Sequence, residues 1–161
     1  MPRTIATNTD VDRAELTEFL RPRHKVVLVT FRRDGSPVGS PVTSGVDEQG
    51  RIVIATYPER AKSHNVARTG TASVVVLSDE FNGPWVHVDG DAELLTQGGD
   101  GADDPAVDAL VDYFRSISGE HPDWAEYRQA MVDQGKALIR ITPTRWSPVA
   151  TGGFPARLAE S

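Results

Sequence analysis

The chain of 161 residues contains no cysteine, and this absence removes several kinds of chemistry at once. Disulfide bonds, thiolate metal sites and cysteine nucleophiles are all excluded. No apolar run approaches the roughly 20 residues that a membrane-spanning helix needs. Residues 1–9 also lack the apolar stretch of a secretory signal. We therefore expect a cytoplasmic protein.

The motifs of several common enzyme classes are missing as well. The four histidines are scattered, without the paired spacing of a metal site, so no metal is expected. No serine lies in a nucleophile elbow, and the glycines around Gly99 precede no Lys-Ser/Thr pair of a nucleotide-binding loop. A protein without an evident acid, base or nucleophile suggests that a cofactor performs the difficult step.

Composition is that of one ordinary globular domain spanning residues 1–161, with 39% apolar and 25% charged residues. The net charge of −6 is unevenly spread. Residues 100–133 hold nine acids and two arginines, so the rest of the chain is close to neutral. Such a chain can bind a small anion, but it lacks the basic face of a nucleic-acid-binding protein.

Apolar and β-branched runs separated by turns predict strands over 24–32, 36–46, 51–57, 72–78, 85–95 and 136–142. Helices are predicted over 11–20, 61–68, 105–118 and 122–133, the last two within a helical insertion of about residues 103–134. Asp12 followed by Glu15 resembles a capping box at the start of the first of them. Pro37 and Pro41 cannot donate ladder hydrogen bonds, so their strand should be an edge or a bulged one. Tight turns and few helices favour an antiparallel, mainly β barrel with peripheral helices, in the α+β class.

The segment after the third predicted strand holds the most informative residues. Arg60 and Lys62 lie where a new helix presents its free backbone N–H groups. A helix N-terminus carries a partial positive charge, and a guanidinium and an ammonium there make a phosphate site plausible. The alternative is a solvated basic helix start. His64 could contribute, although a surface histidine is the simpler interpretation.

Two further features have a binding and a structural interpretation. Trp85 offers a flat apolar face for stacking on an aromatic ligand, or it belongs to a core or subunit interface. Asp89 and Asp91 would share one side of a strand, but charged side chains mostly stay in solvent. We therefore interpret this acidic pair as a solvated strand edge.

Three motifs and the order of the elements carry a resemblance to a known family. The motifs are Asp34-Gly35-Ser36-Pro37 through Ser40-Pro41-Val42, Pro58 to Val66, and Gly119 to Trp124 with Tyr127 to Met131. The chain resembles the pyridoxamine-phosphate-oxidase-like split barrels (the PPOX class), which include the FMN-binding split barrels. Within them it most resembles the actinobacterial branch that uses the deazaflavin coenzyme F420.

The resemblance implies a homodimer with the cofactor in a groove at the subunit interface. Arg60, Ala61 and Lys62 would hold the cofactor phosphate, and Asn65 would support that turn. Thr56 would bond near the phosphate or the ribityl chain. Trp85 of the partner subunit would approach the ring, while the second strand would lie against it through Ser40, Pro41 and Val42.

The expected activity is therefore an F420H2-dependent reductase that passes a hydride to a conjugated small molecule. The alternatives are an FMN-dependent oxidase or reductase of the same fold and a non-catalytic F420-binding carrier. The coenzyme's polyglutamate tail is anionic, which makes the acidic 100–133 segment a puzzling neighbour. Arg115 or Arg128 could approach the groove, or simply lie on a solvated helix face. No catalytic residue, proton donor or substrate is predicted.

Overall fold

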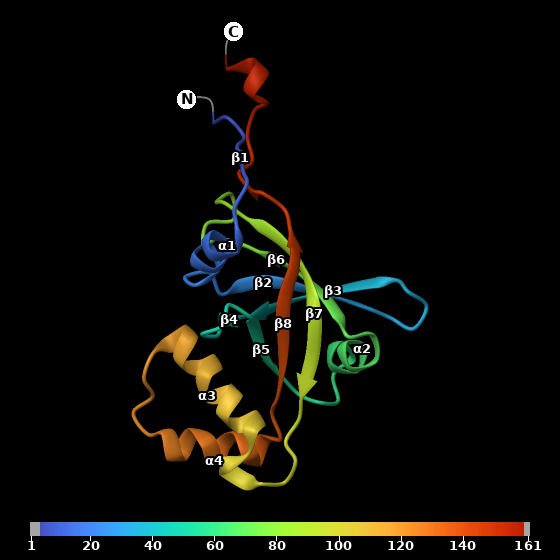
Figure 1. The fold of residues 1–161 in the computed structure, drawn as a ribbon, viewed down its shortest axis with the longest axis vertical. Helices are drawn as coiled ribbons and strands as arrows, with labels where there is room; N and C mark the ends of the chain where they lie inside the picture. Colours follow the sequence, from blue (N-terminus) through green and yellow to red (C-terminus); the bar gives the residue numbers. More distant parts are fainter. Residues whose placement is uncertain (1–3, 160–161) are drawn as a thin grey trace.

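The computed structural model describes residues 4–159, which form a curled antiparallel sheet flanked by helices (Figure 1). Seven strands follow the order β3-β2-β6-β7-β8-β5-β4 and make a half-barrel, which confirms the predicted split-barrel fold. The strands are β1 (Asn8–Thr9), β2 (Lys25–Phe31), β3 (Pro37–Thr43), β4 (Gly45–Val46), β5 (Ile52–Thr56), β6 (Thr71–Val76), β7 (Val86–Leu95), β8 (Ala137–Trp146) and β9 (Val149–Ala150). The helices are α1 (Arg13–Leu20), α2 (Ala61–Thr69), α3 (Pro105–Ser118) and α4 (Trp124–Gln134), with 3-10 turns η1 (Gly101–Asp103) and η2 (Ala156–Leu158).

The inner face of the curled sheet supplies the main core. Alternate side chains of β2, β6 and β7 point inward, as the buried–half-buried alternation along β2 shows. A second, smaller core lies between the sheet and the α3–α4 pair, and it includes Leu110, Val111, Met131 and Leu138. The helical pair is thus packed on the barrel through its own apolar side chains, and α3 has the predicted bounds.

The first helix begins at Arg13, two residues after the predicted start at residue 11. Asp12 accepts a hydrogen bond from the Glu15 N–H at 2.8 Å, and the Glu15 side chain bonds back to the Asp12 N–H at 3.1 Å. These two bonds form the expected capping box, which satisfies two backbone donors at the helix start. Leu16 and Leu20 then pack into the main core.

The prediction of one continuous strand over residues 36–46 is wrong. It divides into β3 and β4 at Ser44, a buried residue whose N–H bonds to the His24 carbonyl 2.9 Å away. This bond ends the β2–β3 pairing and directs the chain to the other edge of the sheet. The prediction for Pro37 and Pro41 is confirmed, because β3 is an edge strand and its prolines need no second partner.

The predicted last strand, residues 136–142, is too short. Strand β8 continues through Pro143 to Trp146, because Pro143 pairs with Gly90 next to a bulge in β8, where Thr144 is the extra residue between the Asp89–Arg145 and Gly90–Pro143 pairs. A side chain at Gly90 would begin within 2.6 Å of Ile141 Cγ2. The missing Cβ lets the two strands approach, and the bulge accommodates a residue that cannot donate to the ladder.

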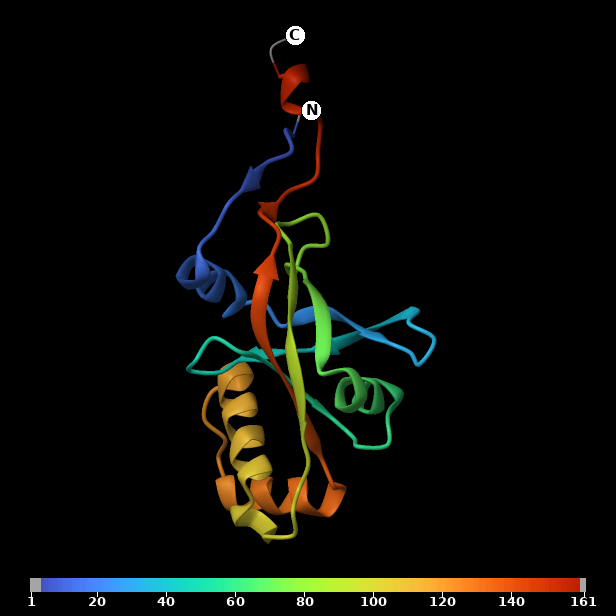
Figure 2. The same cartoon turned by 45° about the vertical axis from the view of Figure 1, so that its right-hand side comes forward.

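The two ends of the described chain run side by side away from the barrel (Figure 2). Strands β1 and β9 pair there, and the Ala6 N–H bonds to the Phe154 carbonyl at 2.9 Å. These short strands were not predicted. Across residues 4–159, no helix is long and apolar enough to cross a membrane.

Candidate functional site

Positively charged residues lie at the start of α2, as predicted. Arg60 is the N-cap residue, with an extended backbone, and its carbonyl accepts bonds from the Ser63 and His64 N–H groups. Among the described residues, neither the Ala61 N–H nor the Lys62 N–H has a protein acceptor. Two free backbone donors therefore lie at the start of the helix, next to Arg60 and Lys62 in the chain.

A third cation joins this end of the helix from strand β8. The Lys136 ammonium lies 4.1 Å from the centroid of the Tyr57 ring, and the Arg60 guanidinium lies 5.9 Å from the same centroid. Burial lowers the pKa of Lys62 most, followed by repulsion from Arg60 and Lys136. The three cations thus share one electrostatic environment with no carboxylate among the causes of the shift. We call Arg60, Lys62, Lys136 and the free N–H groups the anion seat.

An open hollow of about 560 Å³ adjoins Lys136. Its walls come from β3, β5 and the α3–α4 pair, so it lies where the barrel meets the helical insertion. Pro41 and Val42, two of the predicted ring contacts, line it, whereas Ser40 does not. The remaining lining residues are Thr43, Ala55, Tyr113, Phe114, Tyr127, Met131 and Gln134.

Two tyrosines of this hollow stay protonated at neutral pH. Burial, followed by proximity to Tyr113, raises the pKa of Tyr127 to about 12. Burial also raises the pKa of Tyr113 above its usual value. Tyr127 donates to the Leu110 carbonyl at 2.9 Å, while Tyr113 reaches the Thr43 carbonyl only at 3.4 Å. Tyr113 is therefore the hydroxyl that is held more loosely.

Thr56 and Asn65 are buried beside the seat and bond within the protein. The Thr56 hydroxyl lies 3.2 Å from the Ser63 hydroxyl, which in turn donates to the Tyr57 carbonyl at 2.7 Å. Asn65 donates to the Thr30 hydroxyl at 3.2 Å, tying α2 to β2. Both residues hold the helix start in place.

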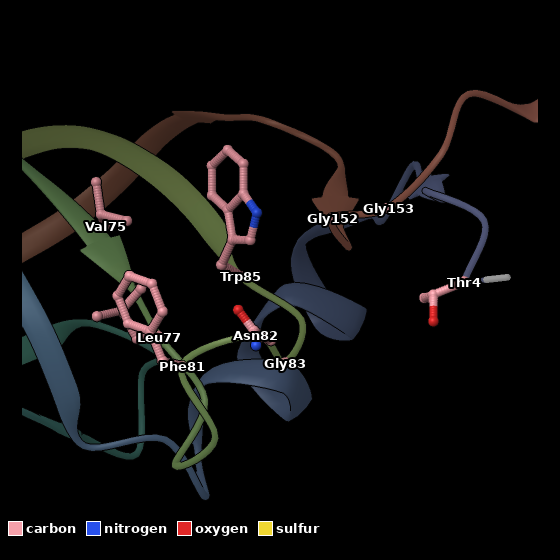
Figure 3. Close-up of a pocket in the computed structure, with 9 residues that line it drawn as sticks. All are labelled: Thr4, Val75, Leu77, Phe81, Asn82, Gly83, Trp85, Gly152 and Gly153. Atoms are coloured by element: carbon pink, nitrogen blue, oxygen red, sulfur yellow. The ribbon is translucent and has the colours of Figure 1, made fainter. Parts of the chain in front are cut away.

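Trp85 lies in a different hollow, of about 600 Å³, which is also lined by Thr4, Gly152 and Gly153 from the two ends of the chain (Figure 3). The ends of the chain lie at the opposite end of the barrel from the α3–α4 pair (Figure 1). Val75, Leu77 and Phe81 are drawn around it, and Phe81 is 85% exposed. Within one chain, the structure does not bring Trp85 together with the other predicted site residues. Gly83 and the polar Asn82 complete the lining.

Asp89 belongs to a polar network on the same face of β7 as Trp85. Its carboxylate accepts bonds from Ser73 at 2.5 Å and from Arg145 at 2.9 Å, and lies 2.8 Å from His87 Nε2. The Ser73 bond is the main cause that lowers the pKa of Asp89 to about 2. The prediction that Asp89 and Asp91 form a solvated strand edge is thus wrong for Asp89, which is hydrogen-bonded and half-buried. Asp91 is exposed.

No group of three or more metal-ligating side chains is assembled anywhere in residues 4–159. The contacts described above bring together positive charge, aromatic rings and free backbone donors. Such a site suits an anionic group attached to a planar body.

Comparison with known proteins assigns the chain to a family. The sequence profile described as pyridoxamine 5'-phosphate oxidase matches residues 13–150, which is most of the chain. The chain belongs to the pyridoxamine 5'-phosphate oxidase family.

Solved structures with the same fold include proteins of different kinds. A conserved hypothetical protein from Mycobacterium tuberculosis has a TM-score of 0.67 at 18% identity, covering 92% of this chain and 90% of that one. An F420 reductase has a TM-score of 0.57 at 18% identity, covering 81% and 94%. A heme storage protein from Vibrio cholerae has a TM-score of 0.62 at 16% identity, covering 84% and 93%. At these identities the likeness is one of fold.

In this member of the pyridoxamine 5'-phosphate oxidase family, sequence reasoning missed Lys136, Tyr57 and Tyr113. Lys136 immediately precedes β8, and its position follows from the pairing of Thr56 with Ala137. That pairing joins strands 81 residues apart along the chain, and no local pattern encodes it. A lysine at the start of a strand was the one available signal, and it does not identify the neighbouring strand.

The Gly119–Trp124 motif occupies a structural corner of this family member. The Trp124 Nε1–H donates to Glu120 at 2.8 Å, and Arg115 donates to the same carboxylate at 2.9 Å. Phe114, His121 and Tyr127 pack against the indole ring or against one another. The motif therefore fixes the angle between α3 and α4.

Proposed function

We propose that the protein is an F420H2-dependent reductase that transfers a hydride from reduced deazaflavin to a conjugated small-molecule acceptor. The observation that carries the proposal is the anion seat next to a hollow lined by Pro41, Val42 and aromatic side chains. The family fold and the F420 reductase among its structural neighbours support the same assignment.

The seat fits a phosphate. Arg60 and Lys62 supply charge-assisted donors next to the free Ala61 and Lys62 N–H groups, and Lys136 supplies a third cation. We assign the phosphate of the cofactor to these residues. Thr56 and Asn65 act as positioning residues, because their bonds to Ser63 and Thr30 hold α2 in place.

The adjoining hollow fits a planar ring. Pro41 and Val42 provide apolar contact from β3, and we place Ser40 beside them through its backbone. Reduced deazaflavin, when bound, supplies a hydride to an acceptor. The chain's own contribution is to orient the ring, exclude water through its apolar lining and leave one ring face open. Tyr113, protonated and loosely held, can donate a hydrogen bond to an acceptor oxygen.

A homodimer completes the site in this proposal. Trp85 is 38% exposed and lies with the exposed Phe81 in an apolar hollow remote from the seat. Exposed apolar surface of this kind is typical of a protein–protein contact. A second copy packed there would cover both rings and would bring its Trp85 toward the cofactor of the first copy.

Fluorescence titration of the purified protein with F420 and with FMN tests the proposal. We expect F420 to bind more tightly, with steady turnover of a quinone or an enone when F420H2 is supplied. Tight FMN binding without F420 binding would identify an FMN-dependent oxidase or reductase instead. F420 binding without turnover of any acceptor would identify a carrier.

A further inference from the structure

A second basic hollow lies between α2 and the β2–β3 turn, and Lys62 does not line it. It measures about 700 Å³ and is lined by Arg32, Arg33, Ala61, His64, Asn65, Ala67 and Arg68. No acidic side chain lines it, although the chain as a whole carries a net charge of −6. Three arginines therefore converge on one hollow of an acidic protein.

These arginines lack the ion pairs that other arginines of the chain make. Arg51, Arg115, Arg128, Arg140 and Arg145 each contact a carboxylate. Within residues 4–159, no ion pair engages the three arginines of the hollow. All three side chains are exposed, so their charges are open to an anion that enters the hollow.

Two of these arginines, Arg32 and Arg68, are held by hydrogen bonds to the protein. Arg68 donates to the Phe31 carbonyl and, at 3.2 Å, to the Asn65 side chain. Asn65 is only 6% exposed and bonds to Thr30 of β2 at 3.2 Å. Arg32 bonds to the Pro37 carbonyl at 3.0 Å across the β2–β3 turn. The nearby Asp34 carboxylate is bonded to Ser36 at 2.6 Å and does not line the hollow.

We propose that this hollow is a second anion site, which takes a group bearing two or more carboxylates or phosphates through Arg32, Arg33 and Arg68. Arginine suits such a group because its planar fork binds two oxygens at once. Ala61 borders the hollow and also lies between Arg60 and Lys62 of the anion seat. The group is therefore either an anionic extension of the molecule whose phosphate occupies the seat or a separate small polyanion.

Calorimetric titration with inorganic pyrophosphate tests the site without any redox cofactor. We expect the wild-type protein to bind at the hollow, and the R32Q/R33Q variant to bind there roughly tenfold or more weakly. R157Q is the matched control for the single substitution R33Q, because Arg157 is exposed in η2 and each substitution removes one positive charge. It should bind as the wild type does.

Arg33 has no hydrogen bond or ion pair to the rest of the described chain, so R33Q alone should fold normally and weaken binding about threefold. Equal pyrophosphate affinity in the wild type, R33Q and R32Q/R33Q would overturn the proposal, as would loss of all binding in K62A alone. Because K62A probes the seat and R32Q/R33Q probes the hollow, this site and the proposed function can fail separately.

The same variants distinguish the two sources of the anion. If R32Q/R33Q weakens binding of F420 that carries its polyglutamate tail but not of the deazaflavin lacking the glutamates, the hollow holds the tail. If R32Q/R33Q binds both deazaflavins as tightly as the wild type does but no longer binds pyrophosphate, the hollow takes a separate polyanion. Either result supports an anion site.

Discussion

The ammonium group of Lys136 lies over the face of Tyr57, 4.1 Å from the ring centroid. This cation–π contact joins the end of β5 to the start of β8 and holds a third positive charge beside Arg60 and Lys62. The ring provides electron density to the lysine without neutralising it. Lys136 thus remains available to an incoming anion.

Replacing Lys136 with Gln should weaken binding of a phosphate-bearing cofactor about tenfold. The substitution removes a charge-assisted contact worth roughly 1.5 kcal/mol, while the side-chain length is largely kept. Fluorescence titration measures the loss. K25Q is the matched control, because Lys25 pairs with Asp79 on the surface and should not affect affinity. Equal losses in both variants would mean that Lys136 acts through net charge alone.

As the pH rises, cofactor affinity should begin to fall at a lower pH than it would if Lys62 had the usual pKa of a lysine. Burial and two neighbouring cations lower the pKa of Lys62 from its usual value of 10.5, and only the charged form attracts phosphate. Binding therefore takes up a proton at alkaline pH. K62R should retain affinity to higher pH, because arginine stays charged. An identical pH profile for the wild type and K62R would contradict this role.

The same shift has a consequence for stability. Because the folded pKa of Lys62 lies below the unfolded value, its charge opposes folding at neutral pH, and the penalty disappears as pH rises toward 10.5. We expect K62Q to unfold at the same or a slightly higher temperature than the wild type. Phosphate should stabilise the wild type more than K62Q.

Asp89 should stabilise the fold at neutral pH but not in acid. Its pKa is lowered to about 2 from 3.8, so its contribution is present above pH 4 and is lost as pH falls through 2. At a quarter exposure, this amounts to about 1 kcal/mol. Urea unfolding of D89N should show that deficit at pH 7 and a smaller one at pH 2.5. A deficit independent of pH would indicate lost packing rather than lost charge.

Phe81 should govern the oligomeric state. Light scattering with size-exclusion chromatography should give a dimer for the wild type and a monomer for F81D, because the charge would enter the apolar contact. E80A, altered at the adjacent exposed position, should remain dimeric. A monomeric wild-type protein would contradict the proposed dimer, because no second copy would bring its Trp85 toward the cofactor.

Local signals predicted much of the fold, and non-local pairing explains what they missed. The Asp12–Glu15 capping box placed α1 correctly, because its bonds close within one helical turn. The predicted last strand stops at residue 142, short of Pro143, because the partner of Pro143, Gly90, lies far away in sequence. Arg60 and Lys62 were identified as a cationic helix start because they lie next to that start in the chain. Lys136 was missed because only the pairing of β5 with β8 brings it there.

The most direct test of the proposed function is a paired titration of the wild-type protein and K62A with F420 and FMN. We predict that F420 binds more tightly than FMN to the wild type and about tenfold or more weakly to K62A, by loss of a charge-assisted contact. Tight FMN binding without F420 binding, or equal F420 affinity in the two proteins, would contradict the proposal.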